Sequence, residues 1–240
     1  EKYEIKNETF VEFGVEDYRE SNTRFLVWHN HWSGLIMDGN EKWMTNVKNT
    51  TLYWKRTIES KGAFITKSNI NRLISDCNIL DNDVGLLSVD IDGNDYWILD
   101  TISTIEPRIL ICEFNSIFGS VETVSIPYKD DFYRTNAHYS NTYYGASLAA
   151  FVYWAQKHDY KLVCVNDMFN NAFFVKKAYC DLPELSINEI WRNCSARESR
   201  DEQGKLTYLS IDECRSLTGD LPVIDVLSGE TKLIKDLRFK

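Results

Sequence analysis

Two aspartates stand two positions apart, directly after a run of apolar residues. Asp90 and Asp92 follow residues 84–89, whose sequence VGLLSV is apolar enough for a strand that is buried on both faces. If the strand continues through them, the two side chains point the same way and repel each other. This repulsion requires a counter-charge, which a metal ion, an ammonium group or a proton can supply.

A second polar pair ends the next apolar segment. Glu113 and Asn115 lie at the end of the strand predicted at residues 108–114. Asp90, Asp92 and Glu113, with Asn115 beside them, form an oxygen-rich set of the kind that binds Mg²⁺ or Ca²⁺. The alternative is that the acidic segment after the fourth predicted strand only makes a turn and caps the next helix.

The loop after the first predicted strand has features of a site for a nucleotide-like cofactor. Glu12 and Gly14 give an acid–apolar–glycine opening, although Glu16 and Tyr18 stand where two further glycines are usual in such loops. Asp38 ends the second predicted strand, where an acid is placed to accept hydrogen bonds from ribose hydroxyls. The alternative readings are a solvated charge for Glu12 and a turn residue for Asp38.

A polar, aromatic loop predicted at residues 115–144 contains the best candidate for a general base. His138 lies there among several tyrosines, and an imidazole with a near-neutral pKa suits proton removal from a hydroxyl. Asp92 is the second candidate. Tyr139 and Tyr144 can stack on a sugar or a nucleobase, or else hold the loop closed.

These residues are positioned by strands and helices that alternate along the chain. Such alternation is typical of right-handed crossovers on a parallel sheet that is covered on both faces. Strands are predicted at residues 10–15, 35–37, 63–66, 84–89, 108–114, 161–165 and 172–175, and helices at residues 22–31, 43–58, 68–77, from 95 up to Pro107, and at 145–158.

The last two predicted strands break the pattern. Only six residues connect residues 161–165 to residues 172–175, which is too few for a crossover helix, so the two strands must pair antiparallel. The sequence therefore predicts a doubly wound, mostly parallel, seven-stranded α/β sheet that ends in an antiparallel β-hairpin.

Charge and composition exclude several classes of partner. The chain has 240 residues and a formal net charge of −9, which argues against nucleic acid and anionic membranes as partners. No apolar run approaches the roughly 20 residues that span a bilayer. The six cysteines include no close pair, so we expect reduced thiols in a cytoplasmic protein, with Cys112 and Cys164 buried in strands.

Seven short runs, spread along the chain within or next to the predicted strands and helices, resemble motifs of a known family. They are VEFGV at 11–15, ESNT at 20–23, GLIMDG at 34–39, NIN at 69–71, SVDIDG at 88–93, ICEFN at 111–115 and GASL at 145–148. Together they resemble the FkbM-type branch of S-adenosylmethionine-dependent methyltransferases. The resemblance covers residues 10–175, and the Asp-x-Asp-Gly turn is its most specific element.

This resemblance implies a class I methyltransferase fold with S-adenosylmethionine as cofactor. The implied activity is O-methyl transfer to a small molecule or to a hydroxyl of a carbohydrate or nucleotide-linked sugar, as in polysaccharide biosynthesis. The implied cofactor-binding residues are Glu12, Gly14, Ser21, Asn22, Asp38, Asn69 and Asp90, and the implied substrate-binding residues are Asn115, Tyr139 and Tyr144.

The sequence is also compatible with two other functions. An apolar strand that ends in Asp-x-Asp also mimics the metal-binding motif of nucleotide-sugar glycosyltransferases, and the missing loop glycines are compatible with a non-catalytic binding module of the same fold. We expect a methyltransferase domain over residues 1–180 and a C-terminal appendage, packed on it, over residues 181–240. A homo-oligomer is also open.

Overall fold

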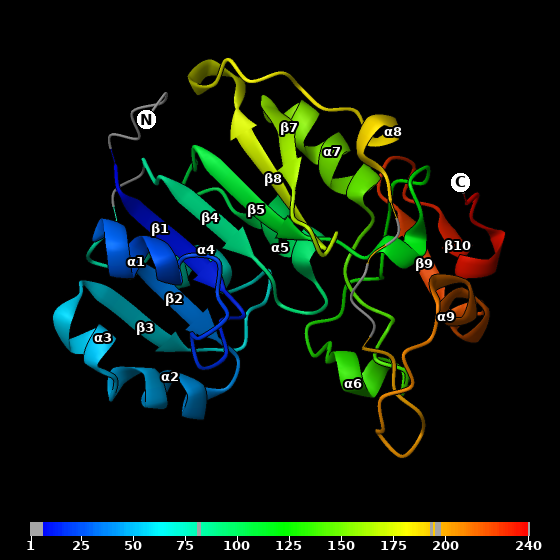
Figure 1. Cartoon of the computed structure of the whole chain (residues 1–240), viewed down its shortest axis with the longest axis horizontal. Coiled ribbons are helices and arrows are strands. Elements are labelled where there is room, and N and C mark those ends of the chain that lie inside the picture. The colour runs from blue at the N-terminus through cyan, green and yellow to red at the C-terminus, as the bar shows by residue number, and fades with distance from the viewer. Residues whose placement is uncertain (1–6, 81–82, 193, 195–197, 240) are drawn as a thin grey trace. The chain divides into compact units, whose positions relative to one another are not determined.

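The computed structural model describes residues 7–80, 83–192, 194 and 198–239 (Figure 1). The strands are β1 (Thr9–Phe13), β2 (Ser33–Asp38), β3 (Ile58–Gly62), β4 (Leu86–Val89), β5 (Ile109–Glu113), β6 (Val124–Ser125), β7 (Tyr160–Val165), β8 (Asn171–Lys176), β9 (Pro222–Asp225) and β10 (Thr231–Leu233). The α-helices are α1 (Arg24–Asn30), α2 (Glu41–Lys48), α3 (Thr51–Lys55), α4 (Ile70–Ser75), α5 (Asp95–Thr101), α6 (Arg134–Ala137), α7 (Leu148–Lys157), α8 (Ile187–Ile190) and α9 (Ile211–Thr218).

Seven strands form one sheet in the order β3-β2-β1-β4-β5-β8-β7. β1 pairs parallel with both β2 and β4, and β2 pairs parallel with β3, whereas β7 and β8 pair antiparallel. The predicted fold class, a doubly wound sheet that ends in a hairpin, is therefore confirmed. The order is also that of the class I methyltransferase fold implied by the resemblance.

The chain divides into two compact units. The first comprises Glu1–Ile91, Trp97–Ile111 and Ala178–Cys180, and the second comprises Asp92–Tyr96, Cys112–Lys177 and Asp181–Lys240. The division of the sequence at residue 180 into a catalytic domain and an appendage stays a prediction.

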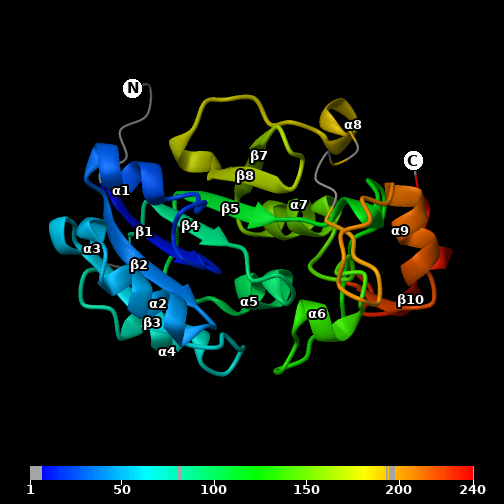
Figure 2. The same cartoon turned by 60° about the horizontal axis from the view of Figure 1, so that its bottom comes forward.

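In the first unit, helices cover both faces of the parallel strands. α1 lies on one face and α4 on the other (Figures 1 and 2). The strands between them carry fully buried apolar side chains, such as Phe10 and Val11 of β1 and Leu35 and Ile36 of β2. This burial on both faces explains why β1 and β2 read as continuous apolar runs.

The third strand was predicted in the wrong place. It lies at Ile58–Gly62 and not at residues 63–66, and the helix predicted at residues 43–58 is in fact α2 and α3, separated at Thr50, whose side chain caps α3. β3 is an edge strand with alternating burial, so its sequence IESKG carries one apolar residue and gives only a weak strand signal.

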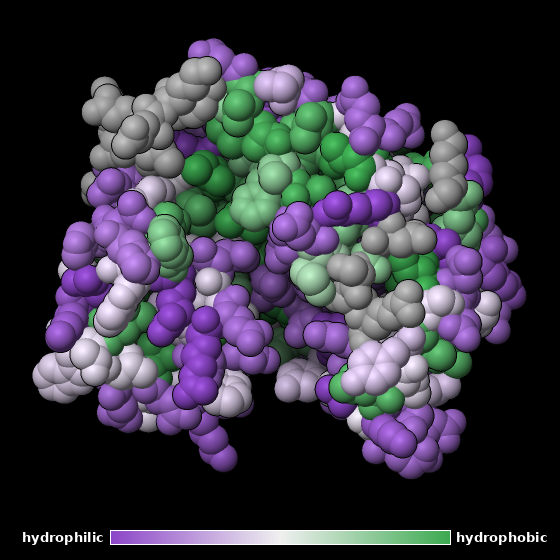
Figure 3. Space-filling view, in the orientation of Figure 1, coloured by the Kyte–Doolittle hydropathy of each residue, from purple (hydrophilic) through white to green (hydrophobic). Residues whose placement is uncertain are grey.

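In the second unit, the predicted hairpin is formed by β7 and β8. Hydrophobic side chains gather over these strands on the face shown in Figure 3. Phe173 and Val175 of β8 are half-buried. The prediction that Cys164 is buried was wrong: a register shift between Leu162 and Cys164 breaks the alternation, and Cys164 is exposed. Cys112 is buried, as predicted, and all six cysteines are free thiols.

The segment predicted as a loop at residues 115–144 contains β6 and α6. β6 pairs antiparallel with β9, which pairs with β10, so residues near the C-terminus complete a three-stranded sheet with this segment. Their side chains form a second core, which includes Val124, Val223 and Ile234. Two residues of β6 are too few to be recognised as a strand without their partner.

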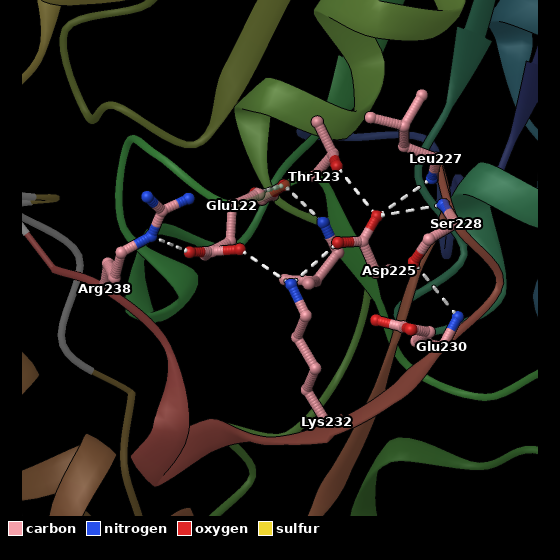
Figure 4. Close-up of polar contacts among 10 residues, drawn as sticks. Glu122, Thr123, Asp225, Leu227, Ser228, Glu230, Lys232 and Arg238 are labelled. Carbon is pink, nitrogen blue, oxygen red and sulfur yellow. Dashed lines mark hydrogen bonds and ion pairs between the residues drawn. The ribbon is translucent and has the colours of Figure 1, made fainter.

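A buried ionic network joins the same segments (Figure 4). Lys232 donates to the carboxylates of Glu122, at 3.0 Å, and Asp225, at 2.8 Å, and Arg238 Nε donates to Glu122 at 2.6 Å. Burial alone raises the pKa of both carboxyls, but hydrogen bonds outweigh it and lower both pKa values. Glu122 accepts from Arg238 and Lys232, and Asp225 accepts from Lys232 and also from Leu227 N, Thr123 Oγ1 and Ser228 N. Lys232 thereby links the C-terminal strands to residue 122.

We expect Lys232→Met to lower the free energy of unfolding by about 2–3 kcal/mol. The substitution leaves the buried carboxylate of Asp225 without its cation, and the loss stays below that of a fully buried pair because Lys232 is 29% exposed. Urea unfolding measures the change, with Lys235→Met as the matched control. Lys235 pairs with Asp220 at 2.7 Å on the surface, so its loss should cost under about 1 kcal/mol. Equal losses in the two variants would show that the network does not stabilise the fold.

The same network predicts a pH dependence. Glu122 and Asp225 have pKa values in the folded state that lie below their ordinary values of 4.5 and 3.8. Their contribution to the free energy of unfolding is therefore complete above the ordinary values and is lost as the pH falls through the folded-state values. In Lys232→Met the fall in the free energy of unfolding at acid pH should be smaller than in the parent protein.

Among the described residues, no helix combines the length and the apolar character that crossing a bilayer requires.

Candidate functional site

In the first unit, the ends of β1, β2 and β4 meet at Gly14. Gly14 has a φ of 70°, and its amide donates to Met37 O at 2.9 Å. A Cβ at this position would lie 1.5 Å from Asp90 O, so only glycine fits between the first loop and the end of β4. The predicted cofactor residues Gly14, Asp38 and Asp90 are therefore brought together.

Glu12 fastens the loop that follows Gly14. Its buried carboxylate accepts hydrogen bonds from the backbone N–H of Asn22, at 2.7 Å, and of Thr23, at 3.1 Å, and from the Thr23 hydroxyl. Burial raises the pKa of Glu12, and the hydrogen bonds from Thr23 and Asn22 oppose that rise. Both carboxylate oxygens thus hold the loop, which gives Glu12 a positioning role.

The loop keeps a glycine-like backbone without the usual glycines. Glu16 and Tyr18 have φ values of 46° and 62°, in the left-handed region that side chains other than glycine rarely adopt. Contacts hold this conformation: Glu16 N donates to Asp38 Oδ2 at 2.9 Å, and the buried Tyr18 hydroxyl lies 2.7 Å from Thr23 Oγ1. Positions 16 and 18 therefore hold a left-handed backbone that glycine would adopt without strain.

Asp38 retains the capacity to bind hydroxyls. Its Oδ1 accepts from Asn40 N at 2.7 Å and its Oδ2 accepts from Glu16 N at 2.9 Å. Each carboxylate oxygen can accept two hydrogen bonds, so one position on each remains for a ligand. The backbone contacts fix the carboxylate at the end of β2.

The other predicted cofactor residues differ in what they contact. The Ser21 hydroxyl is buried by protein and has no hydrogen-bond partner among the described residues, so it is closed to a ligand in this conformation. Asn22 Nδ2 donates to Ser88 Oγ at 3.1 Å. Asn69 accepts from Thr66 N and donates to Phe64 O, so it shapes its own loop. Among these residues, Asp38 is the one with acceptor positions left for the hydroxyls of a bound nucleoside.

In the second unit, Arg134 supplies the counter-charge for the carboxylates. Its Nη1 donates to Asp92 Oδ1, and carboxylate oxygens of Asp92 and Glu113 lie within 4.8 Å of each other. Burial disfavours the charge on Arg134, but Tyr144, Asp92 and Glu113 outweigh burial and raise its pKa. Arg134 was not identified from the sequence, because an arginine in a polar loop gives no signal of its partners.

This arrangement bears on the predicted metal site of Asp90, Asp92 and Glu113. Asp90 belongs to the first unit, and the two carboxylates of the second unit already have the guanidinium as their cation. A divalent ion at the same oxygens would have to displace or repel Arg134, so these two carboxylates fit a metal poorly.

Asn115 organises the loop that carries Tyr144. Its side-chain amide donates to Thr142 O at 2.9 Å and to Tyr144 O at 3.0 Å, and its Oδ1 accepts from Ile117 N at 3.1 Å. Both amide protons are used within the protein. A predicted contact of Asn115 with substrate is therefore restricted to its Oδ1.

His138 lies at the C-terminal end of α6 and stacks on Tyr139 at 4.5 Å between ring centroids. Its Nδ1 accepts a hydrogen bond from Ser140 N at 3.2 Å, and Ser140 Oγ is 2.7 Å away. Burial lowers the pKa of His138. Because Nδ1 is the acceptor, the neutral ring carries its proton on Nε2, which makes Nε2 a hydrogen-bond donor.

A cavity of about 220 Å³ lies in the second unit, and neither Asp92 nor His138 is among the described residues that line it. Glu113, Arg134 and Tyr144 line it together with residues near the C-terminus, among them Glu198 and Leu209. The C-terminal contribution was missed because that part of the sequence is polar and was expected only as an appendage.

Neither a family model nor a curated protein sequence matches the chain. The similar solved structures include TrmK from M. capricolum in complex with S-adenosyl-homocysteine, with 14% identity and a TM-score of 0.39 over 73% of this chain and 65% of that one. The N-terminal domain of EvdMO1 with S-adenosyl-homocysteine and D-fucose has 9% identity and a TM-score of 0.39 over 70% and 73%. An O-methyltransferase from Bacillus cereus in complex with S-adenosyl-homocysteine has 11% identity and a TM-score of 0.42 over 70% and 72%.

Proposed function

We propose that this protein is an S-adenosylmethionine-dependent O-methyltransferase that acts on a small-molecule or carbohydrate hydroxyl. The observation that carries the proposal is the junction at Gly14, where the first loop meets the ends of β2 and β4 beside the fixed carboxylate of Asp38. When bound, the cofactor supplies a methyl group activated on a sulfonium. The protein supplies the site and the proton acceptor.

The proposed cofactor contacts lie within the first unit. Asp38 accepts the two ribose hydroxyls. Ser21 belongs to the set proposed from the sequence, although its hydroxyl is buried by protein. Gly14 lets the first loop pack directly against the backbone at the end of β4. Glu12 holds the loop, while Asn22, Asn69 and Asp90 complete the set proposed from the sequence.

We expect Asp38→Asn to weaken binding of S-adenosylhomocysteine about ten- to a hundredfold. The substitution removes the charge and one hydroxyl acceptor, and charge-assisted hydrogen bonds are worth about 1.5–3 kcal/mol. Isothermal titration calorimetry measures the affinity, and thermal unfolding of each variant shows whether it is folded. The control is Asp100→Asn, an exposed acid on α5 of the same unit. Unchanged affinity in a folded Asp38→Asn variant would move the cofactor elsewhere.

On the acceptor side, the proposed residues belong to the second unit. Asp92 removes the proton from the acceptor hydroxyl, and His138 orients that hydroxyl through Nε2–H, in keeping with the hydrogen bond that Nδ1 accepts. Tyr139 and Tyr144 offer aromatic faces to the acceptor. Asp92 follows the proposed cofactor residue Asp90 with one residue between them.

The two alternative functions have less support. A glycosyltransferase would need Asp90 and Asp92 to hold a metal, and Asp92 is already paired with Arg134. A non-catalytic module was suggested by the missing glycines at positions 16 and 18, but both residues keep the left-handed backbone that glycines would supply.

A further inference from the structure

We infer that the cavity of the second unit, whose lining residue Arg134 pairs with Asp92, holds the acceptor and prefers a small polyhydroxylated ligand carrying an ammonium group. This inference rests on the proposed function, because it names the substrate class of that reaction. It starts from the size of the cavity. About 220 Å³ lies below the roughly 300–1,000 Å³ of sites for drug-sized ligands, so one sugar-sized ring fits and a nucleotide sugar does not.

The only basic residue among the described residues that line the cavity is already engaged. Arg134 donates through Nη1 to Asp92 and through Nε to Asn141 O at 2.6 Å. Its guanidinium also lies 3.8 Å from the centre of the Tyr144 ring. These contacts fix the guanidinium and use its charge within the protein, so it is a poor receptor for a phosphate.

Acidic residues outnumber this one cation at the cavity. Glu113, Glu198 and Asp212 all line it. Asp212 pairs at 3.0 Å with Arg215, which is outside the lining. Glu113, which is buried, and Glu198, whose Oε2 lies 4.0 Å from Arg134 Nη2, are therefore the lining acids that share Arg134 as a cation. The net charge of the lining is therefore negative. A carboxylate accepts hydrogen bonds from hydroxyl and ammonium groups and repels an anion, so the lining favours an amine over a neutral or phosphorylated ligand.

Apolar and aromatic groups complete the lining. Ile117 and Leu209 contribute apolar surface, and Tyr144 contributes its ring. A sugar ring presents both C–H and hydroxyl groups, so it uses acceptors and apolar surface together. The lining therefore suits a polyol better than a purely ionic ligand.

The test uses three ligands of similar size: D-glucosamine, D-glucose and D-glucose 6-phosphate. Each is titrated into the ¹⁵N-labelled full chain at a pH below the pKa of the glucosamine amine, so that the amine carries its proton and charge, and backbone signals of the cavity lining are followed. We expect glucosamine to bind about tenfold more tightly than glucose, because the ammonium group forms charge-assisted hydrogen bonds, and we expect the phosphate to bind most weakly. The preference should fall as salt is added.

Two substitutions assign the preference to the cavity. Glu198→Gln should lower the ratio of glucosamine to glucose affinity about threefold, and Glu113→Gln supplies a second variant at the buried acid. Glu202→Gln is the matched control, since Glu202 is exposed, close in sequence and outside the cavity lining. Equal binding of the amine and the neutral sugar, tighter binding of the phosphate, or no perturbation of the cavity by any of the three would each overturn the inference. A parallel titration with S-adenosylhomocysteine separates the proposed function from the ligand preference of the cavity. If S-adenosylhomocysteine did not bind, the proposed function would be overturned and the ligand preference of the cavity would still stand.

Discussion

Gly14→Ala is expected to destabilise the first unit by more than about 4 kcal/mol and to abolish binding of S-adenosylhomocysteine. The added Cβ would lie 1.5 Å from Asp90 O and 2.7 Å from Asp90 C, and both are backbone atoms that no side-chain rotation can move away. The φ of 70° adds a further cost of about 1–2 kcal/mol for any residue with a Cβ. Overpacking against the backbone and strain at a positive φ are both recognised causes of losses of this size.

A second glycine separates the steric effect from the backbone effect. Gly229 has a φ of 77°, and a Cβ there would meet no atom within 4 Å. Gly229→Ala should therefore cost only the conformational part, about 1–2 kcal/mol, and should leave cofactor affinity unchanged. Denaturant unfolding and calorimetry of both variants give the comparison. If the two variants lost the same stability, the contact between the first loop and β4 would not be as close as the structure shows.

The central strands were predictable because their burial leaves a direct trace in the sequence. β4 and β5 are bounded by polar residues and filled with apolar ones, and the six-residue connection between β7 and β8 excluded every arrangement but an antiparallel pair. β3 escaped because an edge strand buries only one face. β6 escaped because its pairing partner, β9, lies about a hundred residues later in the chain.

The candidate site was predicted unevenly for the same reason. Gly14 and Asp38 could be selected from the sequence because residues at the ends of β1 and β2 must lie at the same edge of the sheet. The prediction that a counter-charge accompanies Asp92 agrees with its pairing with Arg134. The identity of that cation was not predictable, since nothing near position 134 in the sequence indicates that the guanidinium contacts Asp92. Likewise, no local pattern indicates that Glu16 and Tyr18 keep a backbone suited to glycine.

Asp92→Asn is expected to lower turnover about 10²–10⁴-fold and to leave S-adenosylhomocysteine affinity nearly unchanged. An alcohol is a weak nucleophile, so the protein must hold it in line with the methyl group and accept its proton as the new bond forms. An asparagine keeps the size and one oxygen of the side chain but cannot accept that proton at neutral pH. The rate is measured as formation of S-adenosylhomocysteine from S-adenosylmethionine, with an acceptor chosen from the sugars that bind in the titrations described above.

His138→Ala supplies the contrast that separates proton removal from orientation. Because Ser140 N donates to Nδ1 of His138, the neutral ring is a donor at Nε2, and its loss should raise KM more than it lowers kcat. If His138→Ala lost the larger share of kcat while Asp92→Asn stayed within a few-fold of the parent, the two roles would be reversed.

A measurement of turnover in excess EDTA tests whether the reaction needs a metal ion. The pairing of Arg134 with Asp92 predicts full activity in excess chelator. A loss of activity that Mg²⁺ or Ca²⁺ restores would show that an ion binds at these carboxylates in spite of the guanidinium.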